Sequence, residues 1–149
     1  MAEFVLIAEL LKLSESKEWD SAKDEWYLTD VQRSEIPQTC LCSHFPINEI
    51  CTIKNHVTGH TTEVGNCCVK KFNNESDPIF RSVARVRDAI GTPSLSEKTI
   101  VFAFDRGWIS EWEYNFYLDI MRKRNLSEKQ EAVKGRINDK VVAQVDKKR

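Results

Sequence analysis

The feature that most constrains this chain is the clustering of its cysteine and histidine residues. All five cysteines and all three histidines lie between positions 40 and 68 of the 149-residue sequence. Cysteines that served only as small buried side chains would be distributed over the other segments as well. The clustering therefore predicts a metal site in this segment rather than a set of unrelated core residues.

Zinc is the ion that these residue types favour. Thiolate and imidazole ligands in a closed four-coordinate site are typical of structural Zn²⁺, whereas an iron–sulfur cluster more often has four cysteines without clustered histidines. The ligands should come from a turn at residues 40–44 and from the later pair Cys67-Cys68. The predicted zinc ligands are Cys40, Cys42, His44 and Cys68.

Two of these ligand positions have alternatives. Cys67 competes with Cys68, because adjacent residues at a helix start point about 100° apart and both sulfur atoms can hardly reach one ion. Cys51 competes with His44 for the fourth position, although its place inside a predicted strand favours a role as a small buried hydrophobic residue.

A β-hairpin is predicted between the two groups of ligands. Residues 48–55 and 60–64 are rich in β-branched side chains, and they flank the turn signal Thr58-Gly59. His56 and His60 lie beside this turn, where solvent exposure is expected rather than metal binding. A short helix should follow, with Asn66 as its N-cap.

A turn with ligands, a hairpin and a helix with ligands in its first turn form the treble-clef arrangement, which we expect over residues 36–73. The hairpin folds back, so that one ion can hold the turn and the helix start together. The helix N-terminus also presents free N–H groups and the positive end of the helix dipole, which stabilise a cysteine thiolate.

The rest of the chain is predicted to be largely helical. The first thirteen residues fit either a short helix or a buried strand. Asp77 as N-cap, followed by Pro78, should open a helix that ends before Gly91. Three capping-box patterns follow, at Ser94-x-x-Glu97, Ser110-x-x-Glu113 and Ser127-x-x-Gln130. The predicted fold class is α+β: one domain over residues 1–149, with the treble clef packed against a C-terminal helical bundle at 77–145.

Charge is distributed unevenly along the chain. Residues 1–39 contain nine acidic and four basic residues, a net charge of −5, whereas residues 121–149 contain ten basic and four acidic residues, a net charge of +6. A basic surface of this kind can bind DNA or RNA. The candidate nucleic-acid contacts are Lys70, Lys71, Arg81, Arg85, Arg122, Lys123 and Arg124.

The cysteine-rich segment resembles a zinc-binding module of small, mostly uncharacterised proteins from bacteriophages and other mobile elements. The helical stretch WEYNFYLDIMRKRNLSEKQ is similar to tails found on such proteins. The resemblance implies a zinc site and a phage or mobile-element origin, but no shared activity. It rests on Cys40, Cys42, Ser43, His44, Ile53, Asn55, Thr58, Gly59, Val64, Gly65, Cys68, Val69, Lys70, Lys71 and Phe72.

A nuclease of the HNH type is the enzymatic alternative, because such nucleases also build on a treble clef. Asn55, His56, His60 and Asn66 offer similar residue types. The HNH pattern needs an Asp/His-His pair entering the hairpin and a histidine on the helix, however, and the sequence has neither. We therefore expect a non-catalytic adaptor or inhibitor that binds a host or phage protein, with nucleic-acid binding as the alternative.

The N-terminal stretch gives the expected location. MAEFVLIAELLKL has no basic region before its apolar run and no small-residue cleavage site after it, so it does not resemble a signal peptide. No apolar run reaches the length of a membrane span. A cytoplasmic protein is expected, in which cysteines more often bind metal than form disulfides. No small-molecule substrate is implied.

Overall fold

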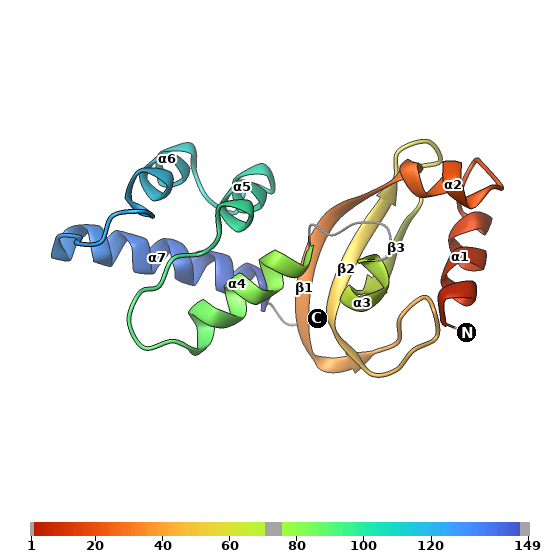
Figure 1. Ribbon diagram of the computed structural model, residues 1–149, viewed down its shortest axis with the longest axis horizontal. Helices are drawn as coiled ribbons and strands as arrows, with labels where there is room; N and C mark the ends of the chain where they lie inside the picture. The colour runs from red at the N-terminus through yellow and green to blue at the C-terminus, as the bar shows by residue number, and fades with distance from the viewer. Residues whose placement is uncertain (1, 71–75, 147–149) are drawn as a thin grey trace. The chain divides into compact units, whose positions relative to one another are not determined.

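The computed structural model describes residues 2–70 and 76–146, and the predicted α+β class is confirmed (Figure 1). Lys71, Phe72 and residues 147–149 lie outside the described residues. The chain divides into two compact units, the first ending at Asp77 and the second running from Pro78 to Asp146. The elements are α1 (Ala2–Lys12), α2 (Trp19–Ala22), the 3₁₀ turn η1 (Lys23–Glu25), β1 (Trp26–Gln38), β2 (Ile47–Asn55), β3 (Thr61–Gly65), α3 (Asn66–Val69), α4 (Ser76–Asp88), α5 (Glu97–Asp105), α6 (Glu111–Ile120) and α7 (Glu128–Val145).

The first unit is built on a three-stranded antiparallel sheet in the order β1-β2-β3. The predicted hairpin is confirmed as β2 and β3. At the centre of the sheet Cys51 pairs with Val31 on one side and with Val64 on the other. All three side chains are fully buried. These three neighbouring residues therefore belong to the hydrophobic core of the unit.

Strand β1 is longer than the sequence predicts. The alternating apolar and polar residues of Glu25–Gln32 predict a strand that ends near Gln32. In the structure, pairing with β2 continues to Gln38, across an irregularity between Arg33 and Gln38. The alternation of apolar and polar residues fades after Gln32, where Glu35, Ile36 and Pro37 are all exposed. Backbone pairing at a sheet edge does not need that alternation, and Pro37 is tolerated there.

The N-terminal residues form a helix, and the loop after it is fixed by a buried carboxylate. Glu25 accepts hydrogen bonds from the backbone N–H groups of Glu15 and Ser16 at 2.8 and 2.9 Å, and from Asn55 Nδ2 at 2.9 Å. The bond from Asn55, followed by that from Ser16, lowers the pKa of Glu25 below its ordinary value of 4.5. The ionised carboxylate thus joins this loop to the end of β2.

The second unit contains α4 from Pro78 onward and the helices α5 to α7. Two capping boxes are confirmed: Ser110 with Glu113 at the start of α6, and Ser127 with Gln130 at the start of α7. The box predicted at Ser94 is wrong. The N-cap of α5 is Ser96, whose side chain accepts the N–H of Thr99, whereas the Ser94 hydroxyl bonds the carbonyl of Met121.

A buried tyrosine joins three segments of this unit. Tyr117 Oη accepts the backbone N–H of Leu95 and donates to Asn138 Oδ1, both at 2.7 Å. Asn138 Nδ2 in turn donates to the carbonyl of Pro93 at 3.0 Å. Burial raises the pKa of Tyr117 to about 12, so the hydroxyl keeps the proton that this network uses.

Candidate metal centre

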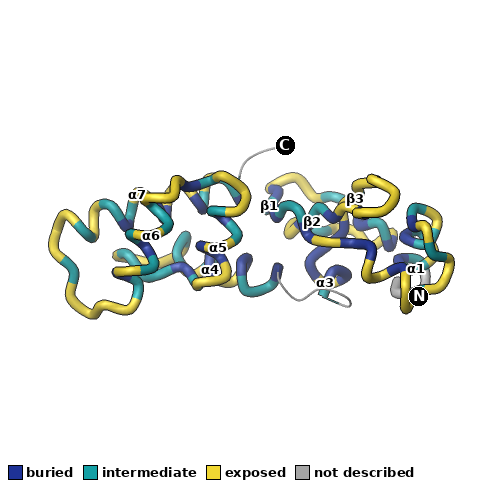
Figure 2. Tube along the Cα trace, turned by 90° about the horizontal axis from the view of Figure 1, so that it is seen from above, coloured by how far each residue is buried: buried dark blue, intermediate teal, exposed yellow. Residues whose placement is uncertain are grey.

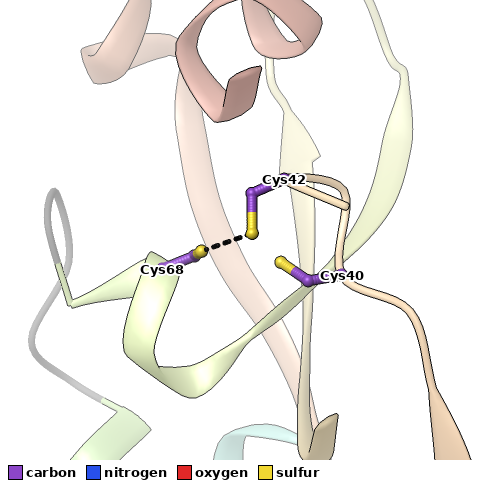
Figure 3. A group of neighbouring side chains, drawn as sticks. All are labelled: Cys40, Cys42 and Cys68. Carbon is purple, nitrogen blue, oxygen red and sulfur yellow. Dashed lines mark hydrogen bonds between the residues drawn. The ribbon is translucent and has the colours of Figure 1, made fainter. Parts of the chain in front are cut away.

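Three cysteines converge in the first unit. The sulfur atoms of Cys40, Cys42 and Cys68 all lie within 4.8 Å of one another, and all three residues are buried. Figure 3 shows the side chains of Cys40 and Cys42 pointing from one turn toward Cys68 on α3. Two segments that are distant in the sequence therefore supply thiols to one point, which could hold a metal ion.

The turn that carries the first two cysteines is held by its own backbone. Ser43 N–H donates to the carbonyl of Cys40 at 2.8 Å, and Cys40 N–H donates to the carbonyl of His44 at 2.9 Å. Ser43 has a positive φ of 75°, which is uncommon for a residue with a side chain. This tight loop brings Cys40 and Cys42, two positions apart, to the same side.

The junction between β3 and α3 brings the third thiol to this turn. Gly65 N–H donates to Cys40 Sγ at 3.2 Å, and hydrogen bonds to sulfur of this kind stabilise a thiolate. A Cβ atom on Gly65 would lie 3.1 Å from Ile47 Cγ2, tighter than most contacts, so glycine suits this close approach. Sequence reasoning missed the role of Gly65 as a donor to the site.

Asn66 fixes the start of α3, but not as the predicted N-cap. Gly65 occupies the N-cap position and Asn66 is the first helical residue. The buried Asn66 side chain accepts from Ser76 Oγ at 2.6 Å and donates to Glu49 Oε1 at 3.2 Å and Asp77 Oδ1 at 3.0 Å. The prediction failed because these partners, on β2 and at the start of α4, are distant in sequence.

The phase of α3 decides which cysteine faces the cluster. Cys68 is buried and in the group of three, whereas Cys67 is exposed. Figure 2 shows the trace at α3 mostly in the colour of buried residues. Adjacent residues of a helix point about 100° apart, so only one of the pair can face the turn. The structure thus brings together Cys40, Cys42 and Cys68, while His44 is exposed and lies outside this group of described residues.

The three thiols affect one another's ionisation. Burial opposes ionisation of Cys42, but the backbone N–H of His44 and the thiol of Cys68 stabilise its thiolate and lower its pKa. Burial, together with contacts to Cys42 and Cys40, raises the pKa of Cys68 far above its ordinary value. A second negative charge beside the first is unfavourable. A divalent cation would remove this repulsion, because all three sulfurs could then bind it as thiolates.

The spacing of the sulfurs fits a tetrahedral metal site. A Zn–S bond of about 2.3 Å places two sulfur ligands of a tetrahedral ion about 3.8 Å apart. The Cys42 and Cys68 sulfurs are 3.3 Å apart, and no pair in the group exceeds 4.8 Å. The observed sulfur spacing is therefore close to that of ligands that share one ion.

A cavity of about 470 Å³ adjoins the three sulfurs. Besides the three cysteines, its lining includes His44, the predicted fourth ligand, and Cys67, the predicted alternative to Cys68. Glu49, which is tied to Asn66 Nδ2, also lines it. The cavity is therefore a space beside the three sulfurs that the imidazole of His44 could enter.

The other residues of the cysteine–histidine segment lie outside the group of three. Cys51 is fully buried in the sheet, where burial raises the pKa of its thiol to about 12. His56 and His60 are exposed around the hairpin turn. Asn55, an HNH candidate, is buried and accepts hydrogen bonds from the N–H groups of Val57 and Thr58, so its amide shapes the turn.

The predicted nucleic-acid residues occupy several places. Lys70 Nζ forms an ion pair with Asp77 at 3.3 Å in the first unit, and Lys71 lies outside the described residues. On α4, Arg81 and Arg85 are exposed, and Arg85 donates to the carbonyl of Ser94 at 2.6 Å. The basic residues that follow α6 are all exposed: Arg122, Lys123 and Arg124.

Comparisons of the chain with protein-family models, with curated proteins and with solved structures give no match. Among the described residues, no helix combines the length and the apolar character that crossing a membrane requires.

Proposed function

We propose that this chain is a non-catalytic zinc-binding protein, in which the metal joins the turn at residues 40–44 to α3 in a treble-clef arrangement. The observation that carries the proposal is the convergence of three buried thiols from two separate elements. Thiolates are soft donors that favour Zn²⁺ over the hard cations Mg²⁺ and Ca²⁺. The order of turn, hairpin and short helix is also that of a treble clef.

In this proposal His44 is the fourth ligand. It belongs to the same turn as Cys40 and Cys42 and lines the cavity beside their sulfurs. Its side chain is exposed, so rotation of the imidazole toward the metal breaks no buried contact. Three thiolates and one imidazole would fill a tetrahedral shell, which leaves no open position for a reacting water molecule.

A closed metal site stabilises the fold and has no position for a substrate. The function of such a protein is then the binding of a partner by its surface. We propose that the protein acts as an adaptor or inhibitor of a host or phage protein, in line with its resemblance to phage zinc modules. Ile36, on the exposed part of β1, is 61% exposed, and Phe45, beside the metal turn, is 60% exposed. Exposed aromatic and aliphatic side chains are common anchors of protein interfaces.

Metal content and metal-dependent stability test this proposal. The full-length protein, purified without added chelator, should contain about one zinc ion per chain by inductively coupled plasma mass spectrometry. A strong chelator should lower the melting temperature of the first unit, because metal binding energy contributes directly to its folding. A metal-free preparation that melts at the same temperature with and without added zinc would refute the proposal.

A further inference from the structure

A second surface, in the helical unit, combines an exposed aromatic ring with free cations. Trp112 on α6 is 62% exposed, and one face of its indole is stacked on Phe116, with ring centroids 5.2 Å apart. A cavity of about 550 Å³ lies beside it, between α6 and α7. We call this the Trp112 surface; it is lined by Ser110, Trp112, Glu113, Val133, Arg136 and Lys140.

The α7 side of this surface is positively charged. Lys129, Val133, Arg136 and Lys140 follow the spacing i, i+4, i+7 and i+11, so they share one helix face. The acidic residues of α7 fall outside this spacing, and Asp139 lines a different cavity. Three of the four cations of α7 are thus on the face beside Trp112.

The acidic residue in the cavity is already neutralised. Glu113 Oε2 accepts from Lys140 Nζ at 2.7 Å, and Glu113 Oε1 accepts the backbone N–H of Ser110. Within residues 2–70 and 76–146, Arg136 and Lys129 have no ion-pair partner, so their charges remain available to a ligand. The turn between α6 and α7 adds three more exposed cations, Arg122, Lys123 and Arg124, of which Lys123 forms an ion pair with Asp119 at 3.7 Å.

We propose that the Trp112 surface binds single-stranded nucleic acid, with one base stacked on the open face of Trp112 and the adjacent phosphates beside Arg136 and Lys129. Proteins that bind single-stranded nucleic acid commonly place exposed aromatic rings next to cations. The rings stack on the flat faces of the bases, and the cations bind the negatively charged phosphates. A duplex keeps its bases inside and would leave the indole unused. An acidic peptide would use the cations but not the flat ring.

This inference adds a ligand to the proposed adaptor and does not depend on the zinc site.

The probes are fluorescein-labelled dT20, rU20 and a 20-base-pair DNA duplex, with an oligoglutamate peptide of similar charge as the protein-like polyanion. Binding to the full-length protein, whose zinc content has been measured, is followed by fluorescence anisotropy from 25 to 200 mM NaCl. The dT20 and rU20 arms distinguish a DNA from an RNA ligand.

The proposal predicts that dT20 or rU20 binds more tightly than the duplex and the peptide, with an affinity that falls steeply with salt. Trp112→Ala should weaken binding about 5- to 150-fold, from the usual contribution of one stacked base. Arg136→Ala should lower the slope of log K against log salt concentration by about 0.7, the value for one lost contact to a single strand. Trp112 and Arg136 are exposed, so both variants should fold.

Two control variants belong to the same experiment. Tyr27→Ala removes a partly exposed aromatic residue from the first unit, and Lys98→Ala removes an exposed cation from α5. Both should leave the affinity unchanged within about twofold. Three results would each overturn the proposal: no binding of either single strand at 25 mM NaCl, binding of the duplex or the peptide at least as tight, or a Trp112→Ala variant with unchanged affinity. Because the zinc content is measured separately, such a result would not count against the proposed zinc site.

Discussion

The sulfur atoms of Cys42 and Cys68 lie 3.3 Å apart, although 26 positions separate the two residues in the sequence. This distance exists only when the hairpin between them is formed and α3 has the phase that directs Cys68 toward the turn. Metal binding at these sulfurs would therefore be coupled to the folding of the sheet, since an unfolded chain would not hold them together.

The first prediction separates the two adjacent cysteines of α3. Cys68→Ser should abolish stoichiometric zinc binding, with an affinity loss well beyond the roughly 10- to 100-fold caused by changes outside the ligand set. Cys67→Ser should bind zinc like the unmodified protein, because Cys67 is exposed and outside the group of three. Competition with a chromophoric chelator measures both affinities. The reverse pattern would mean that α3 presents the other cysteine to the metal.

The second prediction concerns the fourth ligand. His44→Ala should weaken zinc binding without lowering the stability of the metal-free protein, because the His44 side chain is exposed. His60→Ala is the matched control, an exposed histidine near the hairpin turn, and it should have no effect on either quantity. Unchanged zinc affinity in His44→Ala would contradict the assignment of His44 as the fourth ligand.

The extent to which the sequence predicts this molecule depends on how local each interaction is. The boxes at Ser110 and Ser127 join residues three positions apart, so their patterns are visible in the sequence. The hairpin is similarly local, because its turn lies between its own strands. The cysteine group was predictable for a different reason. Cysteines that are only buried core residues would be spread along the chain, so their concentration in one segment indicates a shared site.

Features that depend on distant partners could not be predicted. Asn66 has the residue type of an N-cap, but its amide bonds Glu49, Ser76 and Asp77 instead. The extension of β1 to Gln38 depends on backbone pairing with β2 rather than on its own side chains. The Trp112 surface combines residues of α6 and α7, so the sequence of either helix alone does not reveal it.

The third prediction uses the buried carboxylate of Glu25. Its pKa is lowered in the folded state, so its contribution to stability is complete above pH 4.5 and is lost as the pH falls through the lowered value. Glu25→Gln should lower the melting temperature at pH 7 and reduce the further fall between pH 7 and pH 3, as circular dichroism can measure. Glu18→Gln, at an exposed position, should leave both unchanged. An equal acid-induced fall in Glu25→Gln would contradict the assigned role.

The fourth prediction tests the tyrosine network of the helical unit. Tyr117→Phe should destabilise this unit by about 1–3 kcal/mol, because the N–H of Leu95 and the amide oxygen of Asn138 would lose a buried partner. Tyr114→Phe is the control, since Tyr114 is only half-buried and packs by stacking on Phe104. Urea unfolding at neutral pH gives both values. A Tyr117→Phe variant as stable as the control would show that the network contributes little.

The most direct test of the central claim is X-ray absorption spectroscopy at the zinc edge of the purified protein. The account predicts one tetrahedral zinc ion with three sulfur neighbours at about 2.3 Å and one nitrogen neighbour at about 2.0 Å. The sulfur signal should disappear in the Cys68→Ser variant. A protein whose bound zinc has only oxygen and nitrogen neighbours, or that binds no zinc at all, would contradict the assignment of Cys40, Cys42 and Cys68 as a metal centre.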